Sequence, residues 1–233
     1  MYHLIVSTFA IFDNVALIST IKKLKTLRKL KLQVQISVDG YIARPNGEMD
    51  WVVWNWDDKL KNYVFELTEP VDTILLGRKM TDGFVSYWSD VMTKPDDPSS
   101  IDRSHAFAKK MIETPKVVFT KTLKKSQWAN TDIATGDLTD EITKLKNQKG
   151  TDIIVYGGAS FDSSLIRAGL IDEFHLFINP VAIGNGMTIF KDFLKQSIIA
   201  KRKVFKMAIE GNYCYQKTIE YNEKTKPCRS KHK

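Results

Sequence analysis

The sequence predicts a three-layer α/β/α fold, in which a mixed and mostly parallel sheet carries an antiparallel hairpin at its C-terminal end. Short apolar segments rich in β-branched residues alternate with segments of helical spacing, which is the pattern of a parallel sheet covered by helices. Near the end of the chain, two apolar runs flank the turn Glu210-Gly211-Asn212 and favour a hairpin. No repeat or linker divides the 233 residues, so we expect one large domain.

The elements follow from local patterns, taken in chain order. Residues 32–37 alternate apolar and polar side chains and predict a strand that ends at the turn Asp39-Gly40. After a loop with three tryptophans, Asp57 is placed to cap a helix that continues to Pro70. The remaining predicted elements are strand 73–76, a short helix after Gly77, a surface excursion over 87–103, strand 117–120, helix 137–146, strand 152–156, helix 160–168, strand 174–178, and hairpin strands 202–209 and 213–221.

The two ends of the chain differ in charge from its body. The net charge of +8 arises from +5 over residues 1–31 and +4 over residues 223–233, which leaves −1 for the residues between them. A nucleic-acid-binding domain usually carries its basic surface on the folded body, so we expect no nucleic-acid partner. We expect residues 1–28 to be an N-terminal extension outside the fold, 29–222 to be the domain, and 223–233 to be a disordered basic tail.

Two further patterns bear on location. The apolar stretch over residues 1–20 follows no basic segment, contains Asp13 and Asn14, and precedes no small-residue cleavage site, so we expect neither a signal peptide nor a membrane span. Cys214 and Cys228 form no CxxC pair and have no histidine at metal spacing. The sequence therefore favours a cytoplasmic protein without a membrane partner, a disulfide framework or a bound metal.

Three segments place phosphate-binding chemistry where predicted parallel strands end. Gly77 is followed by two cations at a helix start, residues 120–122 read Thr-Lys-Thr, and Gly157-Gly158 separates a strand from a helix. Each alone is also explained by a plain turn or a polar loop. Ligands, however, gather beyond the carboxyl ends of parallel strands, so the three together favour a phosphate-rich cofactor. Neither a strand-to-helix GxGxxG nor a GxxxxGK[ST] motif is present.

Five short motifs occur in a recognisable order. They are Val38-Asp39-Gly40-Tyr41-Ile42-Ala43, Met49-x-Trp51, Leu76-Gly77-Arg78-Lys79, Phe119-Thr120-Lys121 and Val155-Tyr156-Gly157-Gly158. This order resembles the dihydrofolate reductase fold, and more closely the small proteins similar to the C-terminal reductase domain of the bifunctional riboflavin-biosynthesis enzyme. The resemblance covers about residues 29–221. The deaminase half of that enzyme is missing, because no HxE is followed by PCxxC.

The resemblance implies an NADPH-dependent reductase with a mixed, eight-stranded sheet. It also implies which positions contact the cofactor, in four groups. These are Gln35, Ile42 and Ala43 near the nicotinamide, Gly77, Arg78 and Lys79 at the diphosphate and adenosine phosphate, Thr120, Lys121 and Thr122 at the 2′-phosphate, and Gly157, Gly158, Ala159 and Ser160 under the diphosphate.

The catalytic assignment also comes from the resemblance. Folate-reducing relatives place a carboxylate one turn into the first helix, where it holds a pterin edge and helps to deliver the proton. Asp57 and Asp58 stand at this helix start, and their alternative roles are a helix cap and a first-turn acid. Asp58 is the preferred candidate because Asp57 is better placed as the cap. Trp51, Trp54 and Arg44 are candidate substrate contacts, with packing as the alternative for the tryptophans.

The sequence therefore predicts a reductase that transfers hydride from NADPH to a C=N or C=O bond of a small, pyrimidine- or pterin-like heterocycle. An example of such a reaction is that of 5-amino-6-(5-phosphoribosylamino)uracil reductase. Dihydrofolate reduction and a non-catalytic nucleotide-binding protein of the same fold are the alternatives. We expect the protein to form a homodimer and to bind a small-molecule substrate.

Overall fold

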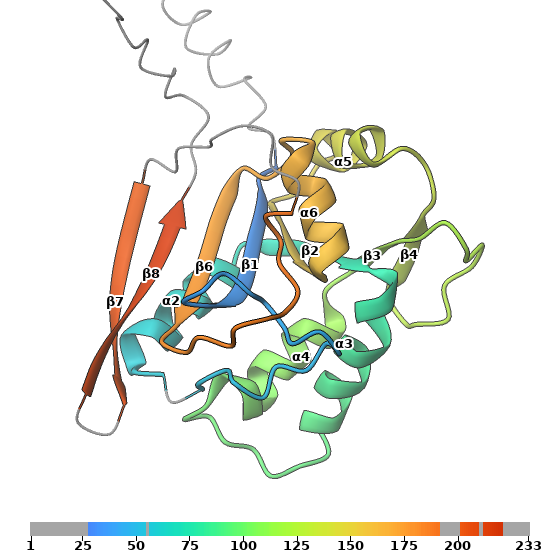
Figure 1. The fold of residues 1–233 in the computed structure, drawn as a ribbon. Helices are drawn as coiled ribbons and strands as arrows, with labels where there is room; N and C mark the ends of the chain where they lie inside the picture. The colour runs from blue at the N-terminus through green and yellow to red at the C-terminus, as the bar shows by residue number, and fades with distance from the viewer. Residues whose placement is uncertain (1–27, 55, 192–200, 210–211, 221–233) are drawn as a thin grey trace, which may run out of the picture.

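The computed structural model describes residues 28–54, 56–191, 201–209 and 212–220 (Figure 1). Strands and helices alternate along most of these residues. Their bounds are β1 Leu30–Ser37, α2 Asp58–Thr68, β2 Val71–Gly77, α3 Arg78–Val91, the 3-10 turn η1 Ile101–Arg103, α4 His105–Glu113, β3 Lys116–Phe119, β4 Thr131–Ala134, α5 Leu138–Asn147, β5 Asp152–Gly157, α6 Ala159–Arg167, β6 Glu173–Asn179, β7 Lys201–Ile209 and β8 Asn212–Glu220.

Six strands form one parallel sheet in the order β4-β3-β2-β5-β1-β6. Because all six run in the same direction, their carboxyl ends lie at one edge of the sheet. β7 and β8 pair antiparallel in a two-stranded sheet of their own, and β8 lies beside β6 (Figure 1). The mixed, eight-stranded sheet that the resemblance implies is thus divided here into a parallel sheet and a separate hairpin.

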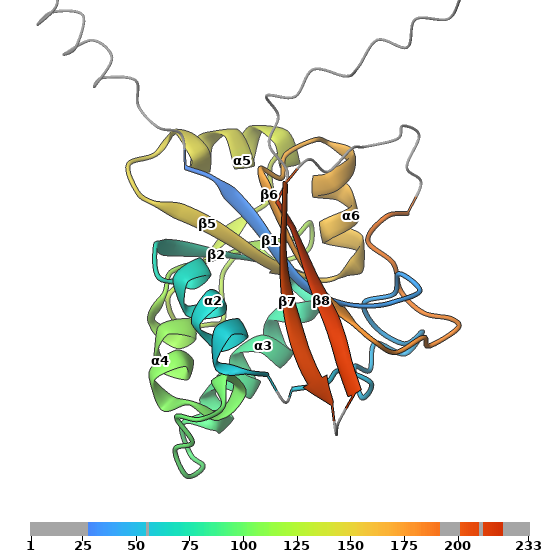
Figure 2. The ribbon, with the colours of Figure 1, turned by 90° about the vertical axis from the view of Figure 1, so that its left-hand side faces the viewer.

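Helices cover both faces of the parallel sheet, and each face buries its own apolar cluster (Figure 2). On one face, α2, α3 and α4 pack residues such as Leu60 and Met111 against Ile154 and other residues of the sheet. On the other face, α5 and α6 pack Ile142 and Leu165 against the apolar side of β1. The predicted three-layer α/β class is therefore confirmed.

Three elements differ from those expected. α3 continues for 14 residues to Val91, so the excursion expected from residue 87 begins later. α4 was not expected, although Ser104 caps it by accepting from the Phe107 backbone, because it lies directly after a segment rich in Pro, Ser and Asp. β4 was also not expected, because a four-residue edge strand in which only Ala134 is buried has almost no periodicity to detect.

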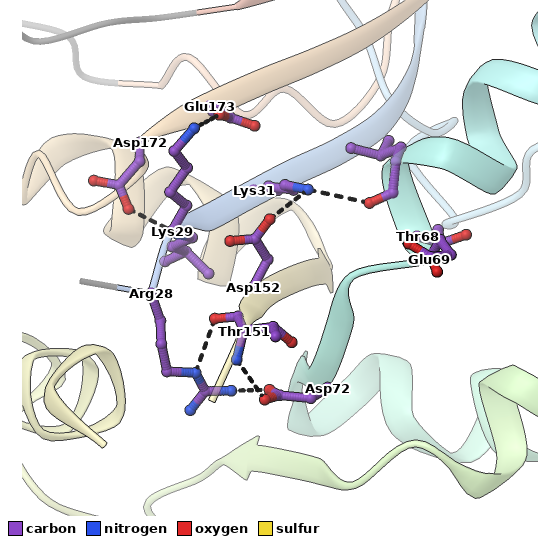
Figure 3. Close-up of polar contacts among 12 residues, drawn as sticks. Arg28, Lys29, Lys31, Thr68, Glu69, Asp72, Thr151, Asp152, Asp172 and Glu173 are labelled. Carbon is purple, nitrogen blue, oxygen red and sulfur yellow. Dashed lines mark hydrogen bonds and ion pairs between the residues drawn. The ribbon is translucent and has the colours of Figure 1, made fainter. Parts of the chain in front are cut away.

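Ion pairs close the N-terminal edge of the sheet (Figure 3). Three cations at the start of β1 each pair with an acid of a different strand or its neighbouring residues: Arg28 with Asp72 of β2, Lys29 with Glu173 of β6, and Lys31 with Asp152 of β5. The last two pairs are 2.6 and 2.7 Å long. These basic residues therefore join the start of β1 to three other strands of the sheet rather than belonging to a solvated tail.

Arg28 corrects the expected boundary between residues 28 and 29. Only 3% of its side chain is exposed, and its guanidinium donates to the Thr151 carbonyl at 3.2 Å and to the Thr73 hydroxyl at 2.7 Å. Arg28 is therefore part of the fold. The rest of the expected extension, residues 1–27, and the expected tail, residues 223–233, lie outside the described residues. Within the described part of the chain, no helix is long and apolar enough to cross a membrane.

Candidate functional site

The three segments with phosphate-binding chemistry lie side by side at the carboxyl edge of the sheet. They follow β3, β2 and β5, which are neighbours in the sheet in that order. The strand register pairs Gly77 with Phe119, the residue before Thr120, and pairs Leu76 with Gly157. The expectation that these segments share one edge is therefore confirmed by the topology.

The two glycines after β5 are glycines for different reasons. Gly157 has a φ of +30°, and a methyl group there would overlap the carboxyl group of Asp162. Gly158 has a φ of +114° and is the N-cap of α6. A methyl group at Gly158 would meet only Met80, at 3.8 Å. Gly157 thus permits a close internal contact, whereas Gly158 leaves the start of α6 uncovered.

Gly77 brings the start of α3 close to the start of α6. It is the N-cap of α3, and a methyl group there would meet the Gly157 carbonyl oxygen at 3.0 Å and Phe161 Cβ at 3.1 Å. α3 and α6 therefore begin at adjoining turns, and neither helix has a side-chain cap. Backbone N–H groups without an internal partner at a helix N-terminus attract anions.

The cations at the start of α3 are held to different degrees. Arg78 pairs with Asp82 at 2.9 Å and lies 5.1 Å from the centre of the Trp128 ring, whose Nε1 donates to the same Asp82. Lys79 is exposed and has no ion-pair partner among the described residues. Arg78 is thus fixed by its packing, whereas Lys79 is available to approach a ligand.

The Thr-Lys-Thr loop after β3 is ordered by its own hydrogen bonds. The buried Thr120 hydroxyl accepts from the backbone N–H groups of Thr122 and Leu123 at 3.1 and 3.3 Å. The Lys121 ammonium donates to two backbone carbonyls of the β4–α5 connection, at 3.1 and 2.9 Å. Lys121 therefore joins two loops at the site, a contact that a polar loop in the sequence does not indicate.

At the other end of the same edge, β1 and β6 hold the tryptophan loop. Asn179 is fully buried, donates to Gln35 Oε1 at 2.9 Å and accepts from the backbone N–H of Val53 at 3.0 Å. Gln35 is thus oriented by β6, and the loop is fixed over the end of β1. Sequence reasoning missed Asn179, because an asparagine at a strand end is typical of an ordinary turn.

The loop after β1 pairs with the loop after β6. The Ile42 N–H donates to the Met187 carbonyl, and the Met187 N–H donates to the Ala43 carbonyl, both at 2.8 Å. Ile42 and Ala43 are buried by this pairing. Arg44, a candidate substrate contact, pairs instead with Asp50 of its own exposed loop at 2.6 Å.

Asp39 strengthens this pairing of loops. Its carboxylate accepts from the backbone N–H groups of Gly184 at 2.8 Å and Ile183 at 3.1 Å. A hydrogen bond from the Ser37 hydroxyl, followed by these backbone bonds, holds the pKa of Asp39 below its usual value. Asp39 is therefore more than the turn residue that the dipeptide Asp-Gly indicates.

The tryptophans divide between packing and exposure. Trp51 is buried, and its indole N–H has no hydrogen-bond partner among the described residues. Trp56 stacks on Phe177 of β6, and Trp54 lies 5.3 Å from the Trp56 ring while remaining 45% exposed. Of the two tryptophans among the candidate substrate contacts, Trp54 exposes a ring surface, whereas Trp51 is buried together with its N–H group.

The carboxylates at the start of α2 take up helix roles. Asp57 caps the helix by accepting from the Leu60 N–H at 2.8 Å. Asp58 exposes 93% of its side chain and pairs with Lys61 at 3.2 Å. The positions of both residues favour the helix-cap and first-turn-acid alternative, and the catalytic role of Asp58 stays a prediction.

A row of polar side chains on the α2 face of the sheet was missed. His175 of β6 pairs with Gln33 of β1 in the register, and its Nδ1 lies 2.6 Å from the Tyr63 hydroxyl of α2. Gln33 Oε1 and the Tyr156 hydroxyl are buried and have no hydrogen-bond partner among the described residues. Alternation along a strand predicts that such residues face water, and only the tertiary structure places them under a helix.

Comparison with known proteins agrees with this geometry. The family model of the RibD C-terminal domain matches residues 28–210. The chain belongs to this family. The uncharacterized protein YyaP of Bacillus subtilis (strain 168) is 35% identical to it over 175 residues, which are 75% of this chain and 86% of that protein. The resemblance to the reductase domain of the riboflavin-biosynthesis enzyme is thereby confirmed.

Two solved structures share the fold at lower identity. A protein from Shewanella sp. PV-4 assigned to riboflavin biosynthesis has a TM-score of 0.59 and 19% identity, with 82% of this chain and 98% of that chain covered. The deaminase/5-amino-6-(5-phosphoribosylamino)uracil reductase of Thermotoga maritima has a TM-score of 0.54 and 18% identity, with 84% of this chain and 57% of that chain covered.

Across the described residues, no group of three or more His, Cys, Asp or Glu could hold a metal ion. The homodimer stays a prediction for light scattering to test.

Proposed function

We propose that this protein is a reductase that transfers hydride from NADPH to a C=N or C=O bond of a small heterocycle. The observation that carries the proposal is the meeting of two helix starts without side-chain caps, at Gly77 and Gly158, where an added methyl group on Gly158 would meet only Met80, at 3.8 Å. A diphosphate suits this surface because both helix dipoles and several N–H groups favour negative charge there. Membership in the RibD C-terminal domain family supports the reductase assignment.

The Thr-Lys-Thr loop is proposed to hold the 2′-phosphate that distinguishes NADPH from NADH. It adjoins the diphosphate turn across β3 and β2 and carries the Lys121 ammonium. Lys121→Ala is expected to weaken NADPH binding by ~1.5–3 kcal/mol, the range for one charge-assisted hydrogen bond, with NADH binding nearly unchanged. Lys125→Ala, which removes an exposed charge further along the loop, is the matched control. An equal loss for both cofactors would mean that Lys121 only orders the loop.

Trp54 is proposed to contact the substrate. The exposed Trp54 ring offers a stacking surface for a small heterocycle. When bound, NADPH would supply the hydride, and the residues of this chain would bind and orient both reactants.

Thermal denaturation of Gly158→Ala with and without saturating NADPH tests the cofactor site. The wild type is expected to gain several degrees, because ligand at about a hundred times Kd adds ~2.7 kcal/mol of stability. The variant is expected to be less stable and to gain almost nothing, because its methyl group would occupy the diphosphate position. Gly169→Ala is the control, since Gly169 follows the other end of α6, has a φ of +66°, and a methyl group there would meet nothing within 4 Å. If NADPH raises the melting temperature of Gly158→Ala as much as that of the wild type, the cofactor does not bind at this turn.

Turnover separates the proposed reaction from its alternatives. NADPH oxidation is measured with dihydrofolate and with a ribosylaminopyrimidine as hydride acceptors. Oxidation that requires the ribosylaminopyrimidine supports the proposal, whereas methotrexate-sensitive oxidation with dihydrofolate favours a dihydrofolate reductase. Binding of NADPH without turnover of any pterin or pyrimidine favours a non-catalytic nucleotide-binding protein.

A further inference from the structure

A carboxyl group is buried directly under the glycine turn. Asp162, in the first turn of α6, is 1% exposed, and its carboxyl occupies the space that a side chain at Gly157 would fill. The Gly158 backbone donates a hydrogen bond to the carboxyl, but Oδ1 has no partner among the described residues. Acids in the first turn of a helix are usually exposed and ionised. Asp162 differs because it is buried and, within the described part of the chain, is not paired with a cation.

Among the described residues, the elements next to Asp162 supply no compensating charge. On α3, Arg78 is engaged with Asp82, and Lys79 is exposed. On β5, the nearest titratable group is the phenol of Tyr156, whose own pKa is raised by burial. On α6, Arg167 lies at the far end and donates to Ser164 at 3.3 Å. The segment 180–190, which accepts from Ser163 of α6, contains no charged residue.

Burial therefore controls the ionisation of Asp162. It raises the pKa of the carboxyl to about 7, and the hydrogen bond from Gly158 lowers it only in part. The carboxyl changes its charge near neutral pH, at the point where the proposed site must accept an anion.

On the basis of the proposed function, we propose that Asp162 is a positioning residue whose carboxyl must be neutral for the Gly157-Gly158 turn to accept a phosphate group. In its ionised form it retains the Gly158 N–H and places a negative charge beneath the ligand. In its protonated form it leaves the positive field of the α6 N-terminus to the ligand. Cofactor binding is then accompanied by proton uptake, which approaches one proton as the pH rises above the pKa of about 7.

Titration with NADPH at about pH 6, 7 and 8.5 tests this role in the wild type, Asp162→Asn and Asp140→Asn. Asparagine keeps the shape and can accept from Gly158, but it does not ionise. Asp140 is an exposed acid in the first turn of α5 and serves as the matched control. The 2′-phosphate of NADPH titrates near pH 6, and it does so for all three proteins, so each variant is compared with the wild type at the same pH.

The wild type and Asp140→Asn are expected to bind NADPH about 30-fold more weakly at pH 8.5 than Asp162→Asn does, with similar affinities for all three near pH 6. Equal affinities of the wild type and Asp162→Asn at every pH would overturn the role of Asp162 and leave the proposed function intact. The role is also overturned if Asp162→Asn folds but binds more weakly than the wild type at every pH, since a carboxylate would then be required.

Melting temperatures without ligand separate this failure from a failure of the proposed function. The folded-state pKa of Asp162 lies above its usual value of 3.8, so ionisation opposes folding, and stability from this group is lost as pH rises through about 7. Asp162→Asn should therefore melt above the wild type at pH 8.5, by a margin that shrinks toward pH 5. If this difference in melting temperature appears but neither protein binds NADPH, the proposed function is wrong, and so is the role of Asp162 in it.

Discussion

The two edges of the parallel sheet are built from opposite chemistry. At the N-terminal edge, the cations Arg28, Lys29 and Lys31 are each matched by an acid of another strand. At the carboxyl edge, the helix starts at Gly77 and Gly158 have no side-chain caps. Toward the carboxyl edge, Trp51, Tyr156 and Asp162 each carry a buried polar atom that has no hydrogen-bond partner among the described residues. The sheet is thus stabilised at one edge and left with unsatisfied groups at the other, which is where a ligand gains most from binding.

This difference makes the effect of a substitution depend on the edge where it is made. At the N-terminal edge, the loss of a side chain should lower the free energy of unfolding without changing ligand affinity. At the carboxyl edge, a small addition should affect packing at Gly157 and ligand affinity at Gly158. The following predictions test this comparison, from the largest expected effect to the smallest.

Gly157→Ala is expected to have the largest effect on stability. Its methyl group would overlap the buried Asp162 carboxyl, and its φ of +30° is unfavourable for alanine, so we expect a loss of roughly 3–5 kcal/mol in the free energy of unfolding. Urea denaturation measures this loss. Gly83→Ala is the control, since Gly83 lies inside α3 in open space and its replacement should stabilise by ~0.5–1 kcal/mol. If Gly157→Ala is as stable as the wild type, the close contact with Asp162 is wrong.

Arg28→Ala tests the opposite edge. It removes a buried guanidinium and leaves Asp72 without its cation, but Asp72 is 39% exposed and water can replace part of the interaction. We therefore expect a loss of about 2–3 kcal/mol in the free energy of unfolding, with NADPH affinity unchanged in the folded protein. Arg103→Ala, which removes a 65% exposed partner of Asp97, should change stability by less than about 0.5 kcal/mol. A change in NADPH affinity in Arg28→Ala would mean that the two edges are coupled.

The sequence predicted the location of the candidate site in the sheet more accurately than it predicted the buried polar groups at that site. Periodicity located most strands and helices, and the cap at Asp57 was predicted from its residue type alone. Direction along parallel strands then placed together the three segments that were predicted to bind phosphate. Burial of a polar residue is not visible in a linear pattern, because Gln33 and Asp162 occupy positions that alternation or helical spacing assigns to water. Arg28 was misplaced for the related reason that a run of cations is typical of a solvated tail.

Glu173→Gln should show that the N-terminal edge depends on pH. Hydrogen bonding from His175, then Lys29, lowers the pKa of Glu173 to about 2, against an opposing effect of burial. Because this is below its usual value of 4.5, the ionised group stabilises the fold above about pH 4.5, and this stability is lost as pH falls toward 2. Denaturation is expected to show a deficit of about 2 kcal/mol for the variant at pH 7 that narrows across this window.

Asp58→Asn is the control for this pH dependence. Asp58 is 93% exposed beside Lys61, so its replacement should alter stability little at any pH. A deficit in Glu173→Gln that stays constant from pH 7 down to about pH 3 would show that the cost comes from the packing of glutamine. The ion pair with Lys29 would then contribute nothing measurable to this edge.

The smallest effect is expected from a chain that begins at Leu27. Residues 1–26 lie outside the family match, which begins at residue 28, and this chain keeps Arg28 with its contacts to Asp72 and Thr151. Its melting temperature should therefore equal that of the full chain within about one degree. A chain that begins at Leu30 loses Arg28 and Lys29 and should melt several degrees lower, at about 2–4 °C for each kcal/mol lost. A large drop for the Leu27 chain would show that the preceding residues stabilise the domain, and the ion pairs would then not be sufficient to close this edge of the sheet.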